Sequence, residues 1–440
     1  VVIEMSDLHS VLLDEDKCEG CTNCVKNCPT DAIRVHQGQA IIKDEKCIDC
    51  GECVRSCQHH AKKIHTDTFD KIEEYEYPIV LVAPSFYGQF TKDIDPTKVV
   101  VAFKELGFEE VWDAALGAEA LTRKTAQYLK NHEGPIISAS CPTVVRLVKL
   151  LYPELIEYLA PFKSPVELIA QRAKKSAVEK GIAEKDVGVF FITPCPAKMS
   201  TVDNPLGMNE SYLDGAIAVD KIYRKLLKKV KEMEGKIESG DYEAPYLGIS
   251  WGKRGGEADL LTAENTISVS GIHNVTSILD ELDRGDLPEI KYFELVACEP
   301  GCVGGVLNVK NPFVAQFNIE SLIKQQDKFI EQSLEQYEFE LDKKFVPNTV
   351  EPLDDDFASA MAKLAELEEE IDELPGLDCA ACGAPDCRTL AEDIINGLAK
   401  RTDCIFILRQ QLAELTDEMS SLAHSLPPII QNEEEENNGD

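Results

Sequence analysis

The chain has 440 residues, of which 44% are hydrophobic, and its formal net charge at pH 7 is −34. This length predicts two to four domains. The acidic balance argues against a nucleic-acid partner, because such binding depends on basic groups that contact phosphates. No apolar run approaches the roughly 18 residues of a membrane span, and the opening segment VVIEMSDLHS lacks a secretory pattern. We therefore expect a cytoplasmic protein with no membrane association.

The first part of the chain carries eight of the 16 cysteines, in two copies of the pattern C-x2-C-x2-C-x3-C. This pattern is the bacterial ferredoxin signature, in which the fourth cysteine of each copy binds the other cluster. Zinc sites prefer C-x2-C pairs separated by a longer loop, so zinc is disfavoured here. We predict a ferredoxin-like α+β domain over residues 1–74 with two 4Fe-4S cubanes. Their ligands are Cys18, Cys21, Cys24 and Cys57 for one cubane, and Cys47, Cys50, Cys53 and Cys28 for the other.

The middle of the chain alternates short apolar runs with helical stretches. The runs IVLVA (79–83), VVVAF (99–103), VGVFFI (187–192) and YFELVA (292–297) read as buried strands. Strands that alternate with helices are typical of parallel sheets. We therefore predict an α/β domain with parallel sheets over residues 75–350.

Four scattered cysteines lie where such runs end, namely Cys141, Cys195, Cys298 and Cys302. A single buried free cysteine is common and needs no function. Sites in open α/β sheets, however, form at the carboxyl ends of the strands. We therefore expect these four cysteines to lie where strands give way to loops, and with them no cysteine of the chain is left over.

Three segments around these cysteines, SASCP, ITPCPAKM and ELVACEPGCVGG, occur in the order and with much of the content of the signature segments of iron-only (FeFe) hydrogenases. Further similarity at KSP, WGKRGG and VSGIHN extends the resemblance over about residues 77 to 320. It implies a hydrogenase that interconverts H2 with protons and electrons. It also implies partners, namely a ferredoxin or another redox protein and the maturation factors that install the active-site iron.

The resemblance also implies roles for individual residues. Cys141, Cys195, Cys298 and Cys302 would bind a cubane, and Cys302 would bridge it to a two-iron unit with CO, CN and azadithiolate ligands, which completes the H-cluster. Lys198 matches the lysine that binds a cyanide ligand. Glu294 falls on a family position as well, either as a hydrogen-bond acceptor behind the site or as a cap.

This sequence departs from the family pattern beside the cluster. Ser140 stands where fast enzymes have a proton-relaying cysteine, whose thiol ionises at a pKa of about 8.5. A serine could serve there only by a concerted hydroxyl relay or by holding water. Thr193 and Val296 replace two methionines that flank the two-iron unit. Such changes mark the sensory branches of the family and predict low turnover with a hydrogen- or redox-sensing role. That role would need a separate signalling protein.

Two other functions compete with this interpretation. A high-turnover, ferredoxin-linked enzyme that evolves H2 is favoured by the intact cysteines and Lys198. A non-catalytic iron–sulfur assembly relative would hold the cubane without the two-iron unit, and the doubled ferredoxin domain disfavours it.

Near the C-terminus, four cysteines follow the spacing C-x2-C-x4-C-x16-C, namely Cys379, Cys382, Cys387 and Cys404. The segment resembles the small cubane-binding module of several anaerobic redox proteins. We predict a third accessory 4Fe-4S cluster here, with a helix over 388–403 that returns Cys404 to the other ligands. Zinc remains an alternative, because C-x2-C spacing does not choose between the metals.

The predicted helical module over residues 351–430 also carries two series of apolar residues at heptad-like spacing. The first comprises Phe357, Met361, Leu364, Ile371 and Leu374, and the second comprises Leu408, Leu412, Leu415, Met419, Leu422 and Leu426. Such a series predicts a seam between helices. The partner is either the other helix of the same chain or a second copy, which gives a homodimer through the C-terminal helix. Residues 431–440 are predicted to be a disordered acidic tail.

Overall fold

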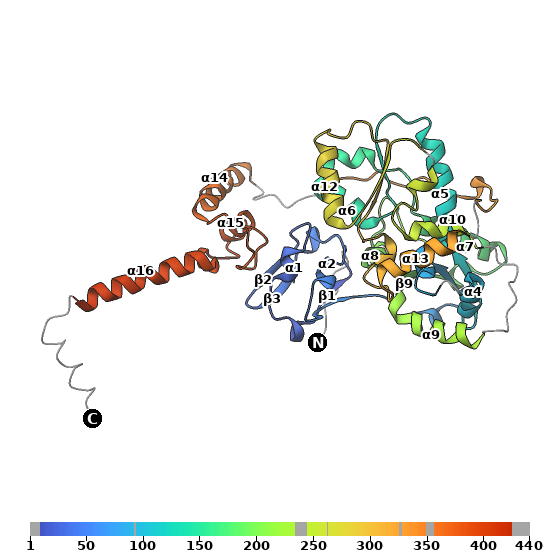
Figure 1. Ribbon diagram of the computed structural model, residues 1–440, viewed down its shortest axis with the longest axis horizontal. Helices are drawn as coiled ribbons and strands as arrows, with labels where there is room; N and C mark the ends of the chain where they lie inside the picture. The colour runs from blue at the N-terminus through green and yellow to red at the C-terminus, as the bar shows by residue number, and fades with distance from the viewer. Residues whose placement is uncertain are drawn as a thin grey trace, which may run out of the picture. The chain divides into compact units, whose positions relative to one another are not determined.

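The computed structural model describes residues 9–91, 94–233, 244–261, 263–324, 328–348 and 356–424. The chain forms two compact units, each with most of its contacts inside itself (Figure 1). Unit 1 comprises Val1–Cys18, Asn27–Ala32 and Ile42–Val350, and unit 2 comprises Glu19–Lys26, Ile33–Ile41 and Glu351–Asp440. All of the predicted tail at 431–440 lies outside the described residues.

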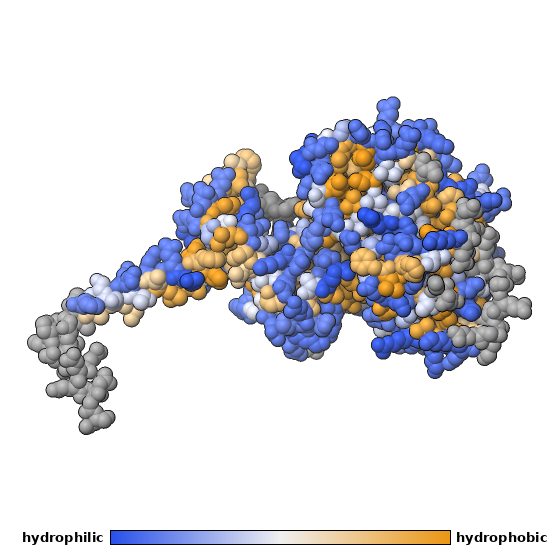
Figure 2. Space-filling view, in the orientation of Figure 1, coloured by the Kyte–Doolittle hydropathy of each residue, from blue (hydrophilic) through white to orange (hydrophobic). Residues whose placement is uncertain are grey.

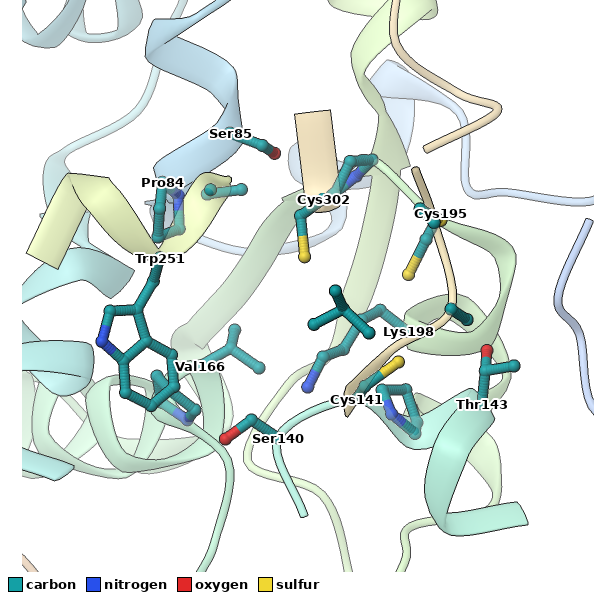
Figure 3. Close-up of a pocket in the computed structure, with 18 of the residues that line it drawn as sticks. Pro84, Ser85, Ser140, Cys141, Thr143, Val166, Cys195, Lys198, Trp251 and Cys302 are labelled. Atoms are coloured by element: carbon teal, nitrogen blue, oxygen red, sulfur yellow. The ribbon is translucent and has the colours of Figure 1, made fainter. Parts of the chain in front are cut away.

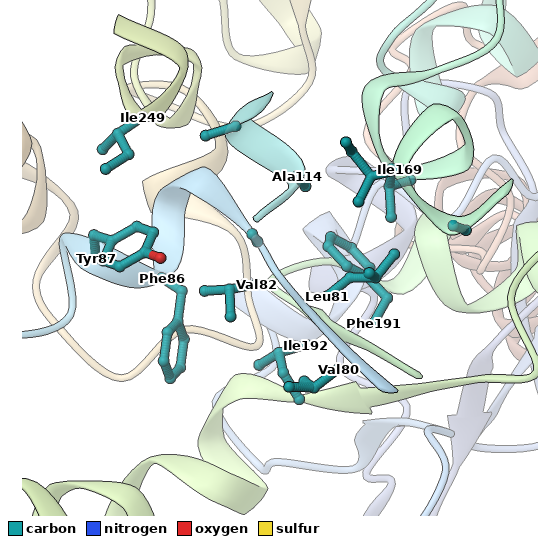
Figure 4. Close-up of a cluster of buried hydrophobic side chains, with 14 of the residues drawn as sticks. Val80, Leu81, Val82, Phe86, Tyr87, Ala114, Ile169, Phe191, Ile192 and Ile249 are labelled. Carbon is teal, nitrogen blue, oxygen red and sulfur yellow. The ribbon is translucent and has the colours of Figure 1, made fainter. Parts of the chain in front are cut away.

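The larger sheet of unit 1 has four parallel strands in the order β6-β5-β8-β9. They are β5 (Tyr77–Val82), β6 (Glu110–Asp113), β8 (Val187–Thr193) and β9 (Gly215–Ala218). Figure 4 shows side chains of β5 and β8 in one apolar cluster with side chains of the covering helices. Strands buried on both faces read as continuous apolar runs, which is why β5 and β8 were recognisable in the sequence. The strands β6 and β9 were not predicted.

The smaller sheet has three parallel strands in the order β10-β11-β7. They are β7 (Ile136–Ile137), β10 (Thr266–Ser270) and β11 (Tyr292–Val296). The helices α6 (Pro142–Leu151) and α12 (Ile272–Asp283) contribute to the core beside it. The predicted α/β class with parallel sheets is thereby confirmed.

The other helices of this α/β region lie around the two sheets. They are α3 (Pro84–Tyr87), α4 (Pro96–Lys104), α5 (Ala114–Leu129), α7 (Pro165–Glu179), α8 (Pro196–Asp203), α9 (Val219–Glu232), α10 (Tyr246–Ile249), α11 (Ala258–Leu261) and α13 (Pro312–Ile323). None of the described helices combines the length and apolar character that crossing a membrane requires.

The predicted strand over 99–103 is wrong, because these residues lie in α4. Asp95 precedes the helix and its carboxylate accepts from the amide of Thr97, while Pro96 occupies the first turn. An N-cap followed by proline is a strong helix start. The helix buries Val99 and Phe103, so packing outweighs the strand preference of the β-branched run.

The N-terminal segment has two related halves. The strands β1 (Val11–Leu13) and β4 (Lys62–Ile64) pair antiparallel, and β2 (Ile33–His36) pairs with β3 (Gln39–Ile42). The short helices α1 (Asn23–Lys26) and α2 (Glu52–Arg55) occupy equivalent positions in the two halves. Left-handed residues recur at matching positions, with φ of 51° at Asp31 and 52° at His60. The cysteine repeat is therefore a backbone repeat as well, as the predicted ferredoxin-like region requires.

Unit 2 contains the short helix α1, the β2–β3 hairpin and three longer helices. The longer helices are α14 (Phe357–Glu373), α15 (Cys387–Ile395) and α16 (Ile405–His424). The predicted helix over 388–403 ends early, at Ile395, because Gly397 adopts a left-handed φ of 72° that stops the helix. A short 3-10 turn at Arg401–Asp403 then leads to Cys404.

Two contacts fix the hairpin to the loop and helix that carry the C-terminal cysteines. The amide of Val35 donates to the carbonyl of Gly383 at 2.9 Å, and a Cβ at Gly383 would lie 2.0 Å from the carbonyl oxygen of Val35. Arg34 also forms an ion pair with Asp393 of α15, at 2.6 Å between Nε and Oδ2, with both side chains almost completely buried. Segments about 350 residues apart in sequence are thus held together inside one unit.

Candidate functional site

The four scattered cysteines lie where strands of both sheets end. Cys141 follows β7 and directly precedes α6, and Cys195 follows β8 and directly precedes α8. Cys298 follows β11, and Cys302 begins a 3-10 turn at Cys302–Gly304. Parallel strands point their carboxyl ends to the same edge, so cysteines distant in sequence are brought together.

These cysteines line one cavity of about 120 Å³. Figure 3 shows the thiols of Cys141, Cys195 and Cys302 and the amine of Lys198 directed into the same space. Val166 and Trp251 contribute to the largely apolar wall. The cavity therefore combines several thiols and one amine within a largely apolar wall.

The site disfavours thiolates unless they receive positive charge. Burial, together with the neighbouring Cys141, raises the pKa of Cys195 to about 11. Burial likewise raises the pKa of Cys298 and of Cys302, and the adjacent thiols add to the effect. Iron bound by the four sulfurs would supply the missing positive charge, so the donor set fits an iron–sulfur cubane.

Lys198 is held beside these thiols by the first turn of α8. Its ammonium donates to the hydroxyl of Ser164 at 3.0 Å. Burial lowers the pKa of this lysine, while Cys195 and Glu167 act in the opposite direction. A buried amine with spare donors can bind an anionic or strongly accepting ligand in the cavity.

Glu294 is a buried residue of β11 that also lines the cavity. Its carboxylate accepts from the amides of Gly255 at 2.8 Å and Ala258 at 2.7 Å, and from the amide of Glu257 at 3.2 Å. The hydroxyl of Ser268, which is partly exposed, is a further partner. Glu294 therefore fixes the loop before α11 against the sheet, which agrees with either predicted role.

The sequence analysis missed Glu257, a second buried carboxylate in the cavity wall. It accepts from the hydroxyl of Ser138 at 2.7 Å and from the phenol of Tyr292. Burial, and then the charge of Glu294, raise the pKa of Glu257 to about 8. The only signal in the sequence was its position directly after Gly255 and Gly256 in a segment of family resemblance.

Of the three residues that depart from the family pattern, Ser140 and Val296 line the cavity and Thr193 contacts the backbone beside it. Ser140 lines the cavity on the side where the Trp251 ring lies (Figure 3), and Val296 also belongs to the wall. Thr193 instead bonds the backbone of Cys195, donating to its carbonyl at 2.9 Å and accepting from its amide at 3.2 Å. Its hydroxyl therefore shapes the loop of a cluster cysteine.

The second ferredoxin-type set adjoins the same cavity, because Asp49 and Cys50 line it. Electrostatic interactions connect the thiol of Cys50 with those of Cys28, Cys47 and Cys53, so the structure brings together the four ligands predicted for this cubane.

Asp49 fastens this loop to the helices behind the central cysteines. Its carboxylate accepts from Arg146 of α6 at 2.9 Å and from Ser200 of α8 at 2.5 Å, and all three side chains are buried. The loop that carries Cys50 is therefore tied to the helices that follow Cys141 and Cys195.

The remaining cysteines belong to the other predicted sites. In unit 2, the thiol of Cys382 interacts with those of Cys379 and Cys404, and Cys387 packs in the same small core. This arrangement of four cysteines is compatible with either an iron–sulfur cluster or zinc. The other ferredoxin-type cubane was predicted on Cys18, Cys21, Cys24 and Cys57. Cys18 and Cys57 belong to unit 1, and Cys21 and Cys24 belong to unit 2. This ligand set stays a prediction.

Three family models match parts of the chain. The model of the iron only hydrogenase large subunit, C-terminal domain, matches residues 76–245. That of a 4Fe-4S dicluster domain matches residues 10–58, and that of an Fe-S cluster family matches residues 374–406.

Individual relatives agree with these matches. Iron hydrogenase 1 of Clostridium pasteurianum is 26% identical over 286 residues, which cover 52% of this chain and 50% of that protein. The periplasmic [Fe] hydrogenase large subunit of Nitratidesulfovibrio vulgaris is 33% identical over 218 residues, which cover 43% of this chain and 51% of that protein. The chain thus matches about half the length of these relatives.

Among solved structures, an [FeFe]-hydrogenase from Chlamydomonas reinhardtii aligns with a TM-score of 0.42 and 19% identity. The alignment covers 56% of this chain and 83% of that one.

Proposed function

Because the chain belongs to the iron-only hydrogenase family, we propose that it interconverts H2 with protons and electrons. The observation that carries this proposal is the cavity in which four cysteines from the ends of three strands meet a buried lysine amine. The cysteines would hold a cubane, and Cys302 would bridge it to the two-iron unit. When bound, that unit supplies the metal at which H2 is formed or split.

The chain's own residues would bind and shield that unit. The amine of Lys198, held by Ser164, is placed to donate to a cyanide ligand. The apolar wall, including Val166 and Trp251, excludes water and so strengthens this interaction. This cavity, with its amine, favours a hydrogenase over an assembly relative that holds the cubane alone.

Glu257 and Glu294 offer a route for protons between the cavity and the surface. Glu257 is neutral at pH 7 because its pKa is about 8, so it can release a proton and take one back. Its electrostatic neighbour Glu294 contacts Ser268, which is partly exposed. This route would carry protons at a lower rate than the relay that a cysteine at position 140 would have begun.

Electrons would pass through the accessory clusters. The cubane on Cys28, Cys47, Cys50 and Cys53 adjoins the central cavity through Cys50. The C-terminal cysteines lie on a module that is fastened to the β2–β3 hairpin by the ion pair between Arg34 and Asp393. A third accessory cluster at that site would exchange electrons with a ferredoxin or another redox partner.

We further propose that turnover is low and that the chain reports hydrogen or redox state to a separate signalling protein. Ser140 in the cavity wall carries this part of the proposal, because a hydroxyl does not ionise near neutral pH. A fast, ferredoxin-linked enzyme would be expected to keep a titratable relay at this position.

Replacing Ser140 tests the low turnover. Ser140→Cys should raise hydrogen evolution about tenfold, which corresponds to about 1.4 kcal/mol off the barrier. Ser140→Ala should change the rate little. The measurement is hydrogen evolution with a chemical reductant from pH 5 to 9, with equal cluster occupancy in all three proteins. A wild type as fast as its relatives, or loss of activity in Ser140→Ala, would show that the serine is itself a working relay.

A further inference from the structure

The last described helix, α16, exposes a row of large apolar side chains. Leu412 is 54% exposed, Leu415 55%, Met419 71% and Leu422 67%. No residue of α16 is buried in the part of the chain that the structure describes. Figure 2 shows apolar residues interspersed with hydrophilic ones along this helix. So large an apolar surface is typical of a binding face.

The spacing of the row specifies its partner. Ile405, Leu412 and Met419 occupy the a positions of a heptad, and Leu408, Leu415 and Leu422 occupy the d positions. Leucine fills every d position, and isoleucine, leucine and methionine fill the a positions, which makes an uninterrupted apolar seam of the kind that pairs with another helix. The row therefore complements a copy of itself.

The flanking positions agree with two copies in register. In a parallel pair, residues at g positions face residues at e positions of the next heptad in the other helix. Gln411 would face Thr416, and Glu418 would face Ala423. No like charges meet at these two pairs of positions, so they do not oppose an in-register pair.

The other apolar helix of the module is already occupied. In α14, Leu364, Leu367 and Ile371 pack into the core with Leu390 and Ala391 of α15. The antiparallel pair of α14 with α16, one of the two alternatives from the sequence, therefore does not form in the described residues. In the described residues, α14 of the same chain is therefore not the partner of the α16 row.

We propose that α16 pairs with α16 of a second copy of the chain in a parallel coiled coil that joins two C-terminal cysteine sites. Cys404, the last cysteine of that site, directly precedes the helix, and its carbonyl accepts the amide of Leu408 at 2.9 Å. A shift of this cysteine, as the occupancy of its site changes, would move the start of the paired helix. The pairing itself does not depend on hydrogenase activity.

Sedimentation of the full, cluster-loaded chain tests the pairing. The wild type should have the mass of a dimer at micromolar concentration, and Leu415→Asp should have the mass of a monomer. Ala413→Asp introduces the same charge at an exposed b position and should leave the dimer intact. Because α16 is exposed, the cluster absorbance of both variants should match that of the wild type.

Cross-linking tests the orientation. Leu422→Cys should form a disulfide between copies under mild oxidation, whereas Ser421→Cys, on the outer face, should not. A monomeric wild type, or a dimer that survives Leu415→Asp, would overturn the proposal. Efficient cross-linking of Ser421→Cys but not of Leu422→Cys would overturn the parallel arrangement. A monomer that still evolves hydrogen would refute the pairing and leave the proposed function intact.

Discussion

Glu257→Gln is expected to lower hydrogen evolution by about 10²-fold or more, because a positioned acid–base group is typically worth 10² to 10⁴ in rate. Glutamine retains an oxygen that can accept from Ser138 and Tyr292, but it cannot release a proton. The wild-type rate should also fall as the pH rises above about 8, because Glu257 then loses the proton that it must donate. This decline should be absent from the variant.

Stability provides an independent check on the charge state of Glu257. Its pKa is higher in the folded chain, about 8, than the ordinary value of 4.5, so ionisation disfavours the folded state. The stabilisation present below pH 4.5 is lost progressively as the pH rises to about 8. Glu257→Gln should therefore be more stable than the wild type at pH 8.

The control for Glu257→Gln is Glu264→Gln, which alters an exposed glutamate shortly before β10 and should change neither rate nor stability. Both variants need the same occupancy of the two-iron unit as the wild type. If Glu257→Gln keeps a rate within about threefold of the wild type, Glu257 does not belong to the proton route.

Asp393→Ala should destabilise unit 2 by about 3 to 5 kcal/mol, the usual cost of removing one partner from a buried ion pair. Both Arg34 and Asp393 are almost completely buried, so the guanidinium loses this partner in a place that water does not reach. We expect earlier unfolding and faster hydrogen exchange in α15 and in the β2–β3 hairpin, measured by denaturant titration and mass spectrometry.

Two variants sharpen this test. Glu392→Ala removes a carboxylate of the same helix whose ion pair with Arg388 is largely exposed, and it should cost less than about 1 kcal/mol. The double variant Arg34→Met, Asp393→Leu replaces the buried charges by apolar groups and should recover most of the lost stability. If Asp393→Ala and Glu392→Ala lowered the stability of unit 2 equally, the buried ion pair between Arg34 and Asp393 would not be what holds the hairpin to α15.

The sequence allowed the cysteine sets and the parallel sheets to be predicted because both leave local signals. Cluster ligands need fixed spacings, as at Cys47, Cys50 and Cys53, and strands buried on both faces are continuous apolar runs, as in β8. The helix at 96–104 was missed because an equally apolar run follows Asp95 and Pro96, and there the N-cap and packing decide.

Contacts between distant segments could not be predicted in the same way. Glu257 becomes a buried acid only because β11 brings Tyr292 and Glu294 beside it. Arg34 and Asp393 meet only after the C-terminal module has folded against the hairpin. Neither pair has a spacing or a pattern that marks it in the sequence, because the burial that gives it meaning is tertiary.

Infrared spectroscopy of the matured chain tests the central claim most directly, because CO and CN ligands absorb only if the two-iron unit is bound. We predict CO and CN bands in the wild type together with hydrogen turnover, and no bands in Cys302→Ser, which lacks the bridging thiolate. A wild type that holds its cubanes, has been supplied with the two-iron unit and still shows no bands would contradict the account and identify a non-catalytic relative.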